Sequence, residues 1–144
     1  LANRWRPVFK EQGLGTDAMA DKWGSQHVKP LLKRLSEPYP YVACLVADGD
    51  HMGRAINRLS SATAHRDFSK ALSSFASSAR EIVEQQHRGA LVYAGGDDVL
   101  AFVSLPKALA CAVALREAFE TTIATACPSL PAEERPSMSV GLGI

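Results

Sequence analysis

The sequence of 144 residues has few cysteines, almost no excess charge and no long hydrophobic run. Its three cysteines are an odd number without a CxxC pair, which disfavours a disulfide framework or a zinc ribbon. We expect reduced, buried thiols in a cytoplasmic protein. Sixteen Lys and Arg residues against fifteen Asp and Glu residues leave a net charge of +1, so charge gives no argument for general nucleic-acid binding. The apolar runs are well short of the ~20 residues that span a bilayer, so we expect no membrane partner.

Several common catalytic signatures are also missing. The sequence contains no Walker A, GxGxxG or GxSxG motif, which removes the usual evidence for P-loop NTPases, dinucleotide-binding enzymes and α/β-hydrolases. No histidine lies in a Cys/His pattern of metal-ligand spacing, so we interpret His27, His65 and His87 as solvated residues. His51 differs because it directly follows an acidic turn, where it could serve as a ligand or phosphate contact.

What is present is the composition of a compact globular chain. Hydrophobic residues make up 47% and charged residues 22%, values that exclude a disordered or collagen-like protein. The length suits one ordinary domain. We expect residues 1–38 to form a lead-in segment with helical turns near 16–23 and 28–35, which packs on the main domain through apolar residues such as Trp23. The main domain is expected over residues 39–144.

The main domain alternates between apolar runs and amphipathic stretches. The continuous apolar run 41–47 predicts a strand that is buried on both faces. Residues 63–87 have helical periodicity with one apolar stripe, and Gly89 is expected to end this helix. The other predicted elements are a short helix within 51–60, paired strands at 90–94 and 99–103, a helix opening at Pro106, and a strand from residue 138. The residues expected to fill the core include Phe68, Phe75, Phe102 and Phe119.

The order of these elements is β-α-β-β-α-β. It predicts an α+β fold of the ferredoxin-like, split βαβ type, with an antiparallel sheet and both long helices on one face. Because the sequence starts at Leu1 and stops at Ile144 within the last strand, we expect a piece of a longer protein. The domain over 39–144 would then be C-terminally incomplete and truncated in strand four.

Two acidic clusters mark where chemistry could reside. The Asp-Gly-Asp sequence 48–50 ends the first strand, and the Gly-Gly-Asp-Asp sequence 95–98 forms the turn between the second and third strands. The first and third strands are central neighbours in a split βαβ sheet, so Asp48 should converge with Asp97 and Asp98. Carboxylates at one point repel each other unless a cation lies between them, and Mg²⁺ is the commonest such cation. Two adjacent glycines let the backbone approach a phosphate or a base.

A purely structural interpretation of these clusters is also open. Asp-Gly and Gly-Asp pairs are ordinary turn residues, and hairpins favour them. Each cluster alone is more typical of a turn than of a ligand site. The expected meeting of the two clusters at one sheet edge makes a metal site an equal alternative.

Four segments together resemble the palm domain of the polymerase/cyclase superfamily, which includes the GGDEF diguanylate cyclases and the large subunit of type III CRISPR effector complexes. Residues 41–53, which end in Asp-Gly-Asp-His-Met-Gly, resemble the first palm strand of the type III subunit, particularly its Cmr (III-B) form. Residues 68–76 resemble its helix motif, residues 92–100 its GGDD hairpin, and residues 139–142 its fourth palm strand. The resemblance covers about residues 39–144.

This resemblance implies an activity and a set of site residues. Members of the family bind ATP at the palm and, when the complex holds a target RNA, join ATP into cyclic oligoadenylates that act as antiviral second messengers. It implies that Asp48, Asp97 and Asp98 hold two Mg²⁺ or Mn²⁺ ions, with the backbone of Gly49 as a further ligand, and that Asp97 and Asp98 are catalytic. The implied nucleotide contacts are Asp50, Met52, Gly53, Ser69, Gly95 and Gly96.

The resemblance also implies partners. These are the other subunits of a CRISPR ribonucleoprotein and a second palm domain, in cis or in trans, that completes the nucleotide pocket. The crRNA and the target RNA would be contacted mainly by other parts of the complex. Full subunits of the family carry an HD nuclease-like domain, a zinc-binding segment, a second palm and a helical C-terminal domain, which this sequence does not contain. We therefore expect this chain alone to bind a nucleotide but to turn over poorly.

Two other functions are alternatives. One is a stand-alone cyclic-nucleotide synthase of the GGDEF-like class. A diguanylate cyclase is disfavoured because Asp98 and Val99 stand where the GGDEF motif has Glu and Phe. The other is a degenerate palm that acts as a scaffold in the ribonucleoprotein, and the intact acidic residues count against it.

Overall fold

The structure, a computed structural model, describes residues 5–34, 41–128 and 130–144. The chain divides into two compact units, residues 1–39 and residues 40–144. Each unit has its own secondary structure and its own packing. Within the described ranges, no helix is long and apolar enough to cross a bilayer.

The first unit is helical. Helix α1 (Trp5–Glu11) is followed by α2 (Asp17–Trp23), which continues through a π-helical turn (Gly24–Val28) into α3 (Lys29–Arg34). The helical turns predicted from the sequence correspond to α2 and α3, whereas α1 was not predicted. The expected packing of this segment on the main domain stays a prediction.

Two contacts join α1 to α2 within the first unit. Arg6 donates a hydrogen bond of 2.7 Å from Nε to Oδ1 of Asp21, and a second one from Nη2 to Oδ2. The hydrogen bond from Arg6 lowers the pKa of Asp21. The rings of Phe9 and Trp23 also meet, with centroids 5.7 Å apart. The bidentate ion pair of Arg6 with Asp21 and the aromatic contact therefore stabilise the packing of α1 on α2.

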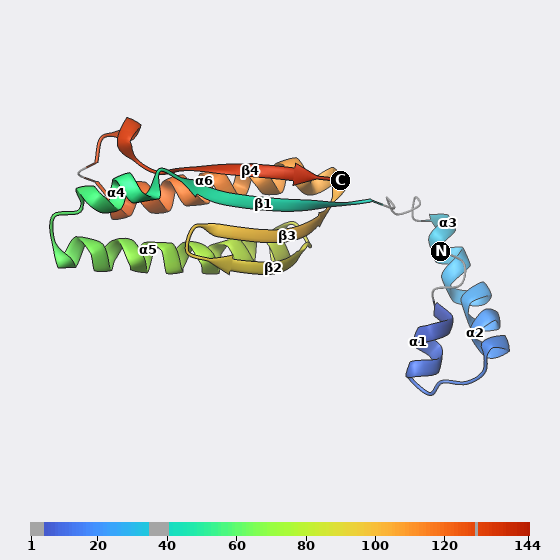
Figure 1. The fold of residues 1–144 in the computed structure, drawn as a ribbon. Helices are drawn as coiled ribbons and strands as arrows, with labels where there is room; N and C mark the ends of the chain where they lie inside the picture. Colours follow the sequence, from blue (N-terminus) through green and yellow to red (C-terminus); the bar gives the residue numbers. More distant parts are fainter. Residues whose placement is uncertain (1–4, 35–40, 129) are drawn as a thin grey trace. The chain divides into compact units, whose positions relative to one another are not determined.

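The second unit is built on a four-stranded antiparallel sheet (Figure 1). Its strands are β1 (Val42–Asp50), β2 (Ala90–Gly95), β3 (Asp98–Ser104) and β4 (Ser137–Gly143). Their spatial order is β2-β3-β1-β4, which puts β1 and β3 at the centre. The register pairs Leu45 of β1 with Ala101 of β3 and Leu142 of β4. This order is that of the split βαβ fold, so the predicted α+β, ferredoxin-like class is confirmed.

Two long helices cover one face of this sheet. Helix α5 (Ala62–Arg80) begins after Ser61, whose side-chain oxygen accepts a hydrogen bond from the backbone N–H of Ala64. It runs on through a π-helical turn (Glu81–Gln86). Helix α6 (Ala108–Ala126) follows a 3₁₀ turn (Leu105–Lys107) that contains Pro106. The short helix α4 (Met52–Arg58) links β1 to α5, and a 3₁₀ turn (Ala132–Glu134) precedes β4.

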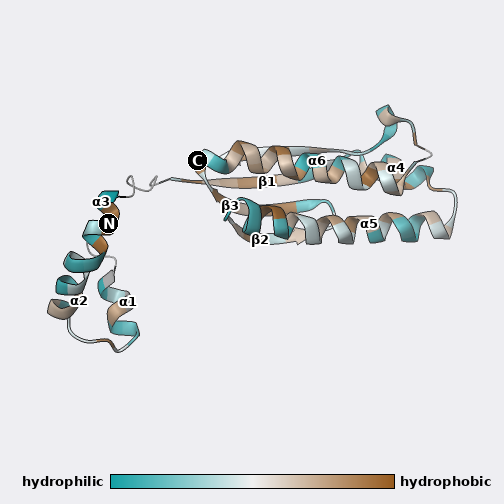
Figure 2. Ribbon diagram, turned by 180° about the vertical axis from the view of Figure 1, so that it is seen from behind, coloured by the Kyte–Doolittle hydropathy of each residue, from teal (hydrophilic) through white to brown (hydrophobic). Residues whose placement is uncertain are grey.

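The hydrophobic core lies between the sheet and these helices. At its centre, Phe75 of α5 and Phe119 of α6 meet edge to face, with ring centroids 5.1 Å apart. The helix stripes predicted from periodicity are confirmed, and the strands add the buried residues Ala43, Leu45, Ala47, Val99, Ala101 and Val103. Figure 2, which views the unit from behind, shows the two long helices in front of the sheet and hydrophilic residues along α5. The unit therefore has a single hydrophobic core, which lies between one face of the sheet and the two long helices.

The other face of the sheet is open, so the prediction that β1 is buried on both faces was wrong. Val42 and Val46 of β1 are 58% and 52% exposed on this face. Phe102 of β3 was expected in the core but is 43% exposed, and Cys44, its register partner, is only partly buried. Both helices lie on one side, so this unit alone covers only half of each strand. The other two cysteines are buried free thiols, as predicted.

The expected role of Gly89 was also wrong. Arg88, with φ of 54°, takes the left-handed conformation after the helix, whereas Gly89 does not. A Cβ atom at Gly89 would lie 2.6 Å from Cγ1 of Val103 and 2.8 Å from the carbonyl oxygen of Phe102. Gly89 is therefore required for the close approach of the chain to β3.

Candidate functional site

The two central strands bring two acidic residues face to face. The antiparallel register pairs Ala47 of β1 with Val99 of β3, so the next positions, Asp48 and Asp98, lie opposite each other. Both residues are exposed on the open face, because Ala47 and Val99 point into the core and side chains alternate along a strand. The convergence of these residues was predicted from the topology, and the register of the sheet produces it.

The side chain of Asp98 is the main cause that raises the pKa of Asp48 above its ordinary value, because a nearby carboxyl group favours the protonated form. Partial desolvation and the negative charges of Asp98 and Asp50 raise the pKa further, while a hydrogen bond from the backbone N–H of Gly49 opposes the rise. The pair therefore concentrates negative charge at one point, where a cation would be stabilising.

The third acid of the predicted cluster, Asp97, lies against the backbone of β1. A Cβ atom at Gly49 would be 2.7 Å from Cβ of Asp97 and 2.9 Å from its Oδ2. Only a glycine at position 49 lets the hairpin turn come this close to β1. Gly49 therefore positions the turn, and the role of its backbone as a metal ligand stays a prediction.

Asp50 is anchored by the neighbouring strand. Its Oδ2 accepts a hydrogen bond of 2.6 Å from the hydroxyl of Ser139 and a longer one, of 3.3 Å, from Ser137. Both serines belong to β4, whose register pairs Asp50 with Ser137 and Asp48 with Ser139. These serines were not predicted as site residues. Their alternation in the last strand was a signal in the sequence, but its meaning depends on the pairing of β4 with β1 that the structure shows.

The two glycines of the hairpin have different surroundings. Gly96 has φ of +68°, a conformation that favours glycine in the tight turn between β2 and β3. Gly95 is covered by a neighbouring ring, since a Cβ atom there would collide with the hydroxyl oxygen of Tyr93. The Tyr93 ring lies beside the Asp98 position, because Gly95 pairs with Asp98. Tyr93 was not predicted as a site residue.

The remaining predicted nucleotide contacts are less closely grouped. Met52, at the start of α4, is partly buried and its Cγ would be 3.1 Å from a Cβ atom at Gly49. Gly53 is exposed, with open space around its Cα atom. Ser69 is exposed on α5, in the helical layer that covers the opposite face of the sheet from Asp48 and Asp98. The assignment of Ser69 as a nucleotide contact stays a prediction.

The carboxylates of this site suit a hard divalent cation whose other ligands are water molecules and phosphate oxygens. Among the described residues, no group of three or more His, Cys, Asp or Glu side chains could hold a metal ion by itself. Mg²⁺ is usually bound through one or two carboxylates and completes its shell with waters and phosphate oxygens. The facing carboxylates of Asp48 and Asp98 fit this mode of binding better than a closed protein cage, whereas Asp97 lies against Gly49.

Comparison with known proteins identifies the sheet-containing unit. Residues 41–144 match the family model for Cas10/Cmr2, second palm domain. The chain is also similar to the CRISPR system Cmr subunit Cmr2 of Pyrococcus furiosus, with 33% identity over 113 residues. That alignment covers 60% of this chain but only 13% of the relative, so the chain spans about one eighth of the relative's length. The chain therefore belongs to the Cas10/Cmr2 family, the large subunits of type III CRISPR complexes, and carries its second palm domain.

Proposed function

We propose that this palm is the ATP-binding, metal-dependent nucleotidyltransferase domain of a type III CRISPR subunit and that it makes cyclic oligoadenylates. The observation that carries the proposal is the meeting of Asp48 and Asp98 at facing positions of the two central strands. Two facing carboxylates repel each other when both are ionised. A cation bound between them removes this repulsion and is therefore stabilising. Palm membership supports a nucleotidyltransferase-like role.

The acidic residues have distinct tasks in this proposal. Asp48 and Asp98 bind the divalent cations in this proposal, and Asp97, which lies against Gly49, is a third ligand once the cations are bound. When bound, such cations neutralise charge on the α-phosphate and lower the pKa of a ribose 3′-hydroxyl. The backbone of Gly49 is a further ligand, and its lack of a side chain keeps the turn in place.

The nucleotide is held by the residues around this pair. Gly95 and Gly96 let the triphosphate approach the backbone of the hairpin, and Asp50, Met52 and Gly53 shape the bend between β1 and α4. Asp50 is held by Ser139, so its carboxylate stays fixed while the nucleotide exchanges. No side chain of the protein needs to act as a nucleophile, because the attacking group is a hydroxyl of the nucleotide.

The proposal places the palm within a larger assembly. The relative in Pyrococcus furiosus is a subunit of a CRISPR Cmr system, and the chain spans 13% of its length. We propose that this palm acts with the other subunits of such a complex and with another palm domain, in cis or in trans. Because the family match identifies this palm as the second one, the expectation that the sequence lacks the second palm was wrong, and the partner palm would be the first. Guide and target RNA would be held mainly by the other parts of the complex, since the net charge of this chain is only +1.

The test is synthesis by the complete subunit in its assembled complex. With target RNA, ATP and Mg²⁺, we expect cyclic oligoadenylates that are resolved by chromatography and mass spectrometry. Asp97→Ala combined with Asp98→Ala should abolish them while the complex still assembles. Unchanged synthesis in the double variant would overturn the site. A wild-type complex that assembles, yet binds neither ATP nor metal, would favour a scaffold.

A further inference from the structure

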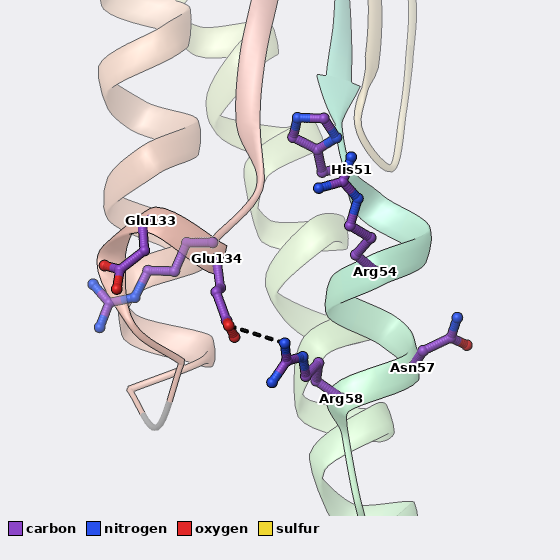
Figure 3. A pocket seen from close by; sticks show the side chains of 7 residues that line it. His51, Arg54, Asn57, Arg58, Glu133 and Glu134 are labelled. Atoms are coloured by element: carbon purple, nitrogen blue, oxygen red, sulfur yellow. Dashed lines mark hydrogen bonds and ion pairs between the residues drawn. The ribbon is translucent and has the colours of Figure 1, made fainter.

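A cavity of about 370 Å³ lies between α4 and the 3₁₀ turn before β4, separate from the acidic pair (Figure 3). Its volume falls in the range of sites for small molecules. Two segments far apart in the sequence form its walls. The residues that line it are His51, Arg54, Asn57, Arg58, Glu133, Glu134 and Arg135.

Positive charge exceeds negative charge in this cavity by one unit. Three arginines stand against two glutamates, which leaves a formal charge of +1 before His51 is counted. One arginine is partly neutralised, since Arg58 donates from Nη2 to Oε1 of Glu134 over 2.9 Å. The other oxygen, Oε2 of Glu134, is buried without a hydrogen-bond partner in the described part of the chain. The pair is therefore joined by one bond only, and Arg58 keeps most of its five N–H donors for a ligand.

The other two arginines are free of carboxylate partners among the residues that the structure describes. Arg135 donates from Nε to the carbonyl oxygen of Leu130 over 2.9 Å, and from Nη2 to that of Pro128 over 3.5 Å. These carbonyls orient the guanidinium without neutralising its charge. Arg54 makes no ion pair with a described residue, and Figure 3 shows it beside the start of α4, on the same side as His51.

We propose that this cavity binds a nucleotide phosphate, supplied either by a free nucleotide or by one unit of single-stranded RNA. Guanidinium groups bind phosphate through paired N–H donors. Their planes and an imidazole ring also stack on unpaired bases. The cavity is larger than a bare phosphate needs, which leaves room for the sugar and the base. Because arginines supply the positive charge, this binding requires no divalent cation.

The experiment measures nucleotide binding by the whole 144-residue chain in EDTA. EDTA removes divalent cations, so a metal-dependent site does not contribute to the signal. The probes are adenosine 5′-monophosphate, followed by calorimetry, and a short fluorescent single-stranded oligoadenylate, followed by anisotropy. The test variants are Arg54→Ala and Arg54→Glu, since Arg54 is exposed and its loss leaves the core intact. The matched control is Arg66→Ala, which removes the same charge from an exposed position on α5.

We expect saturable binding that weakens at least about tenfold in Arg54→Ala, more in Arg54→Glu, and stays unchanged in Arg66→Ala. If both probes bind, a free nucleotide is enough to occupy the cavity. If only the oligonucleotide binds, the phosphate that the cavity recognises belongs to single-stranded RNA. Absence of binding of both probes, equal loss in Arg66→Ala, or unchanged affinity in both Arg54 variants would overturn the proposal. Because EDTA is present throughout, these outcomes are independent of the metal-dependent activity.

Discussion

Asp48 and Asp98 face each other from the two central strands on the open side of the sheet, and the carboxyl group of Asp98 raises the pKa of Asp48. Neither residue belongs to a mobile loop tip, because Asp48 lies within β1 and Asp98 opens β3. The register of the sheet therefore sets the position of both Cα atoms. Polar groups carried on strands are held more accurately than groups on loops. The fold therefore determines where the two acidic residues lie relative to each other.

The raised pKa of Asp48 predicts a pH dependence of stability. A carboxyl group whose pKa is higher in the folded state favours folding fully at pH values below its unfolded pKa. That contribution is lost as pH rises through the folded-state pKa. We therefore expect the Tm of the wild-type chain in EDTA, relative to Asp48→Asn, to fall as pH rises from about 4 towards neutrality. A difference in Tm that does not change with pH would contradict the raised pKa of Asp48.

Gly49 is predicted to be intolerant of a side chain. Gly49→Ala places a methyl group 2.7 Å from Cβ of Asp97, so β1 or the hairpin turn must move. We expect a loss of about 1–3 kcal/mol in the free energy of unfolding, measured by urea denaturation. Gly53→Ala is the control, because open space surrounds that position at the start of α4. It should be neutral or stabilising by up to about 1 kcal/mol, as expected for alanine in a helix. Equal effects of the two substitutions would contradict the close approach of Asp97.

The serines of β4 are predicted to hold Asp50. Ser139→Ala removes the hydrogen bond of 2.6 Å to Oδ2 of Asp50 and should lower the free energy of unfolding by about 0.5–1.5 kcal/mol. Ser137→Ala removes a weaker bond of 3.3 Å and should cost less. In a double-mutant cycle, Ser139→Ala should have no further effect once Asp50 is replaced by Ala. Full additivity of Ser139→Ala with Asp50→Ala would rule out the contact.

Two phenylalanines test which face of the sheet is buried. Phe75→Ala opens a cavity at the centre of the core, and we expect a loss of about 3–5 kcal/mol in the free energy of unfolding. Phe102→Ala, on the open face, should cost less than about 1.5 kcal/mol, because the ring is already 43% exposed. Denaturant unfolding of the two variants gives both values. A cost at Phe102 as large as at Phe75 would mean that the isolated chain covers its open face.

Much of the fold follows from hydrophobic patterning. The stripes on residues 63–87 and on the helix after Pro106 predicted α5 and α6, and glycine with aspartate between two apolar runs predicted the hairpin. The split βαβ order then implied that β1 and β3 are neighbours. The meeting of Asp48 with Asp98 follows from that adjacency and the register.

Other features could not be predicted because the local pattern does not contain them. The run 41–47 is apolar at every position, so it has no alternation to show that only one face is buried. The exposure of Phe102 has the same origin, because its strand is also continuously apolar. The role of Gly89 depends on Val103, a residue distant in sequence, and the anchoring of Asp50 depends on serines in β4. These are consequences of strand register.

We expect the carboxylates of Asp48 and Asp98 to form a divalent-cation site. Calorimetric titration of the chain with Mn²⁺ at neutral pH, without nucleotide, measures this binding. We expect saturable binding that weakens at least about tenfold in Asp98→Asn and stays unchanged in Asp67→Asn, an exposed carboxylate on α5. In EDTA, Asp98→Asn should not lower the Tm, because it removes a repulsive charge. Absence of Mn²⁺ binding at millimolar concentration, or unchanged binding in Asp98→Asn, would contradict the account.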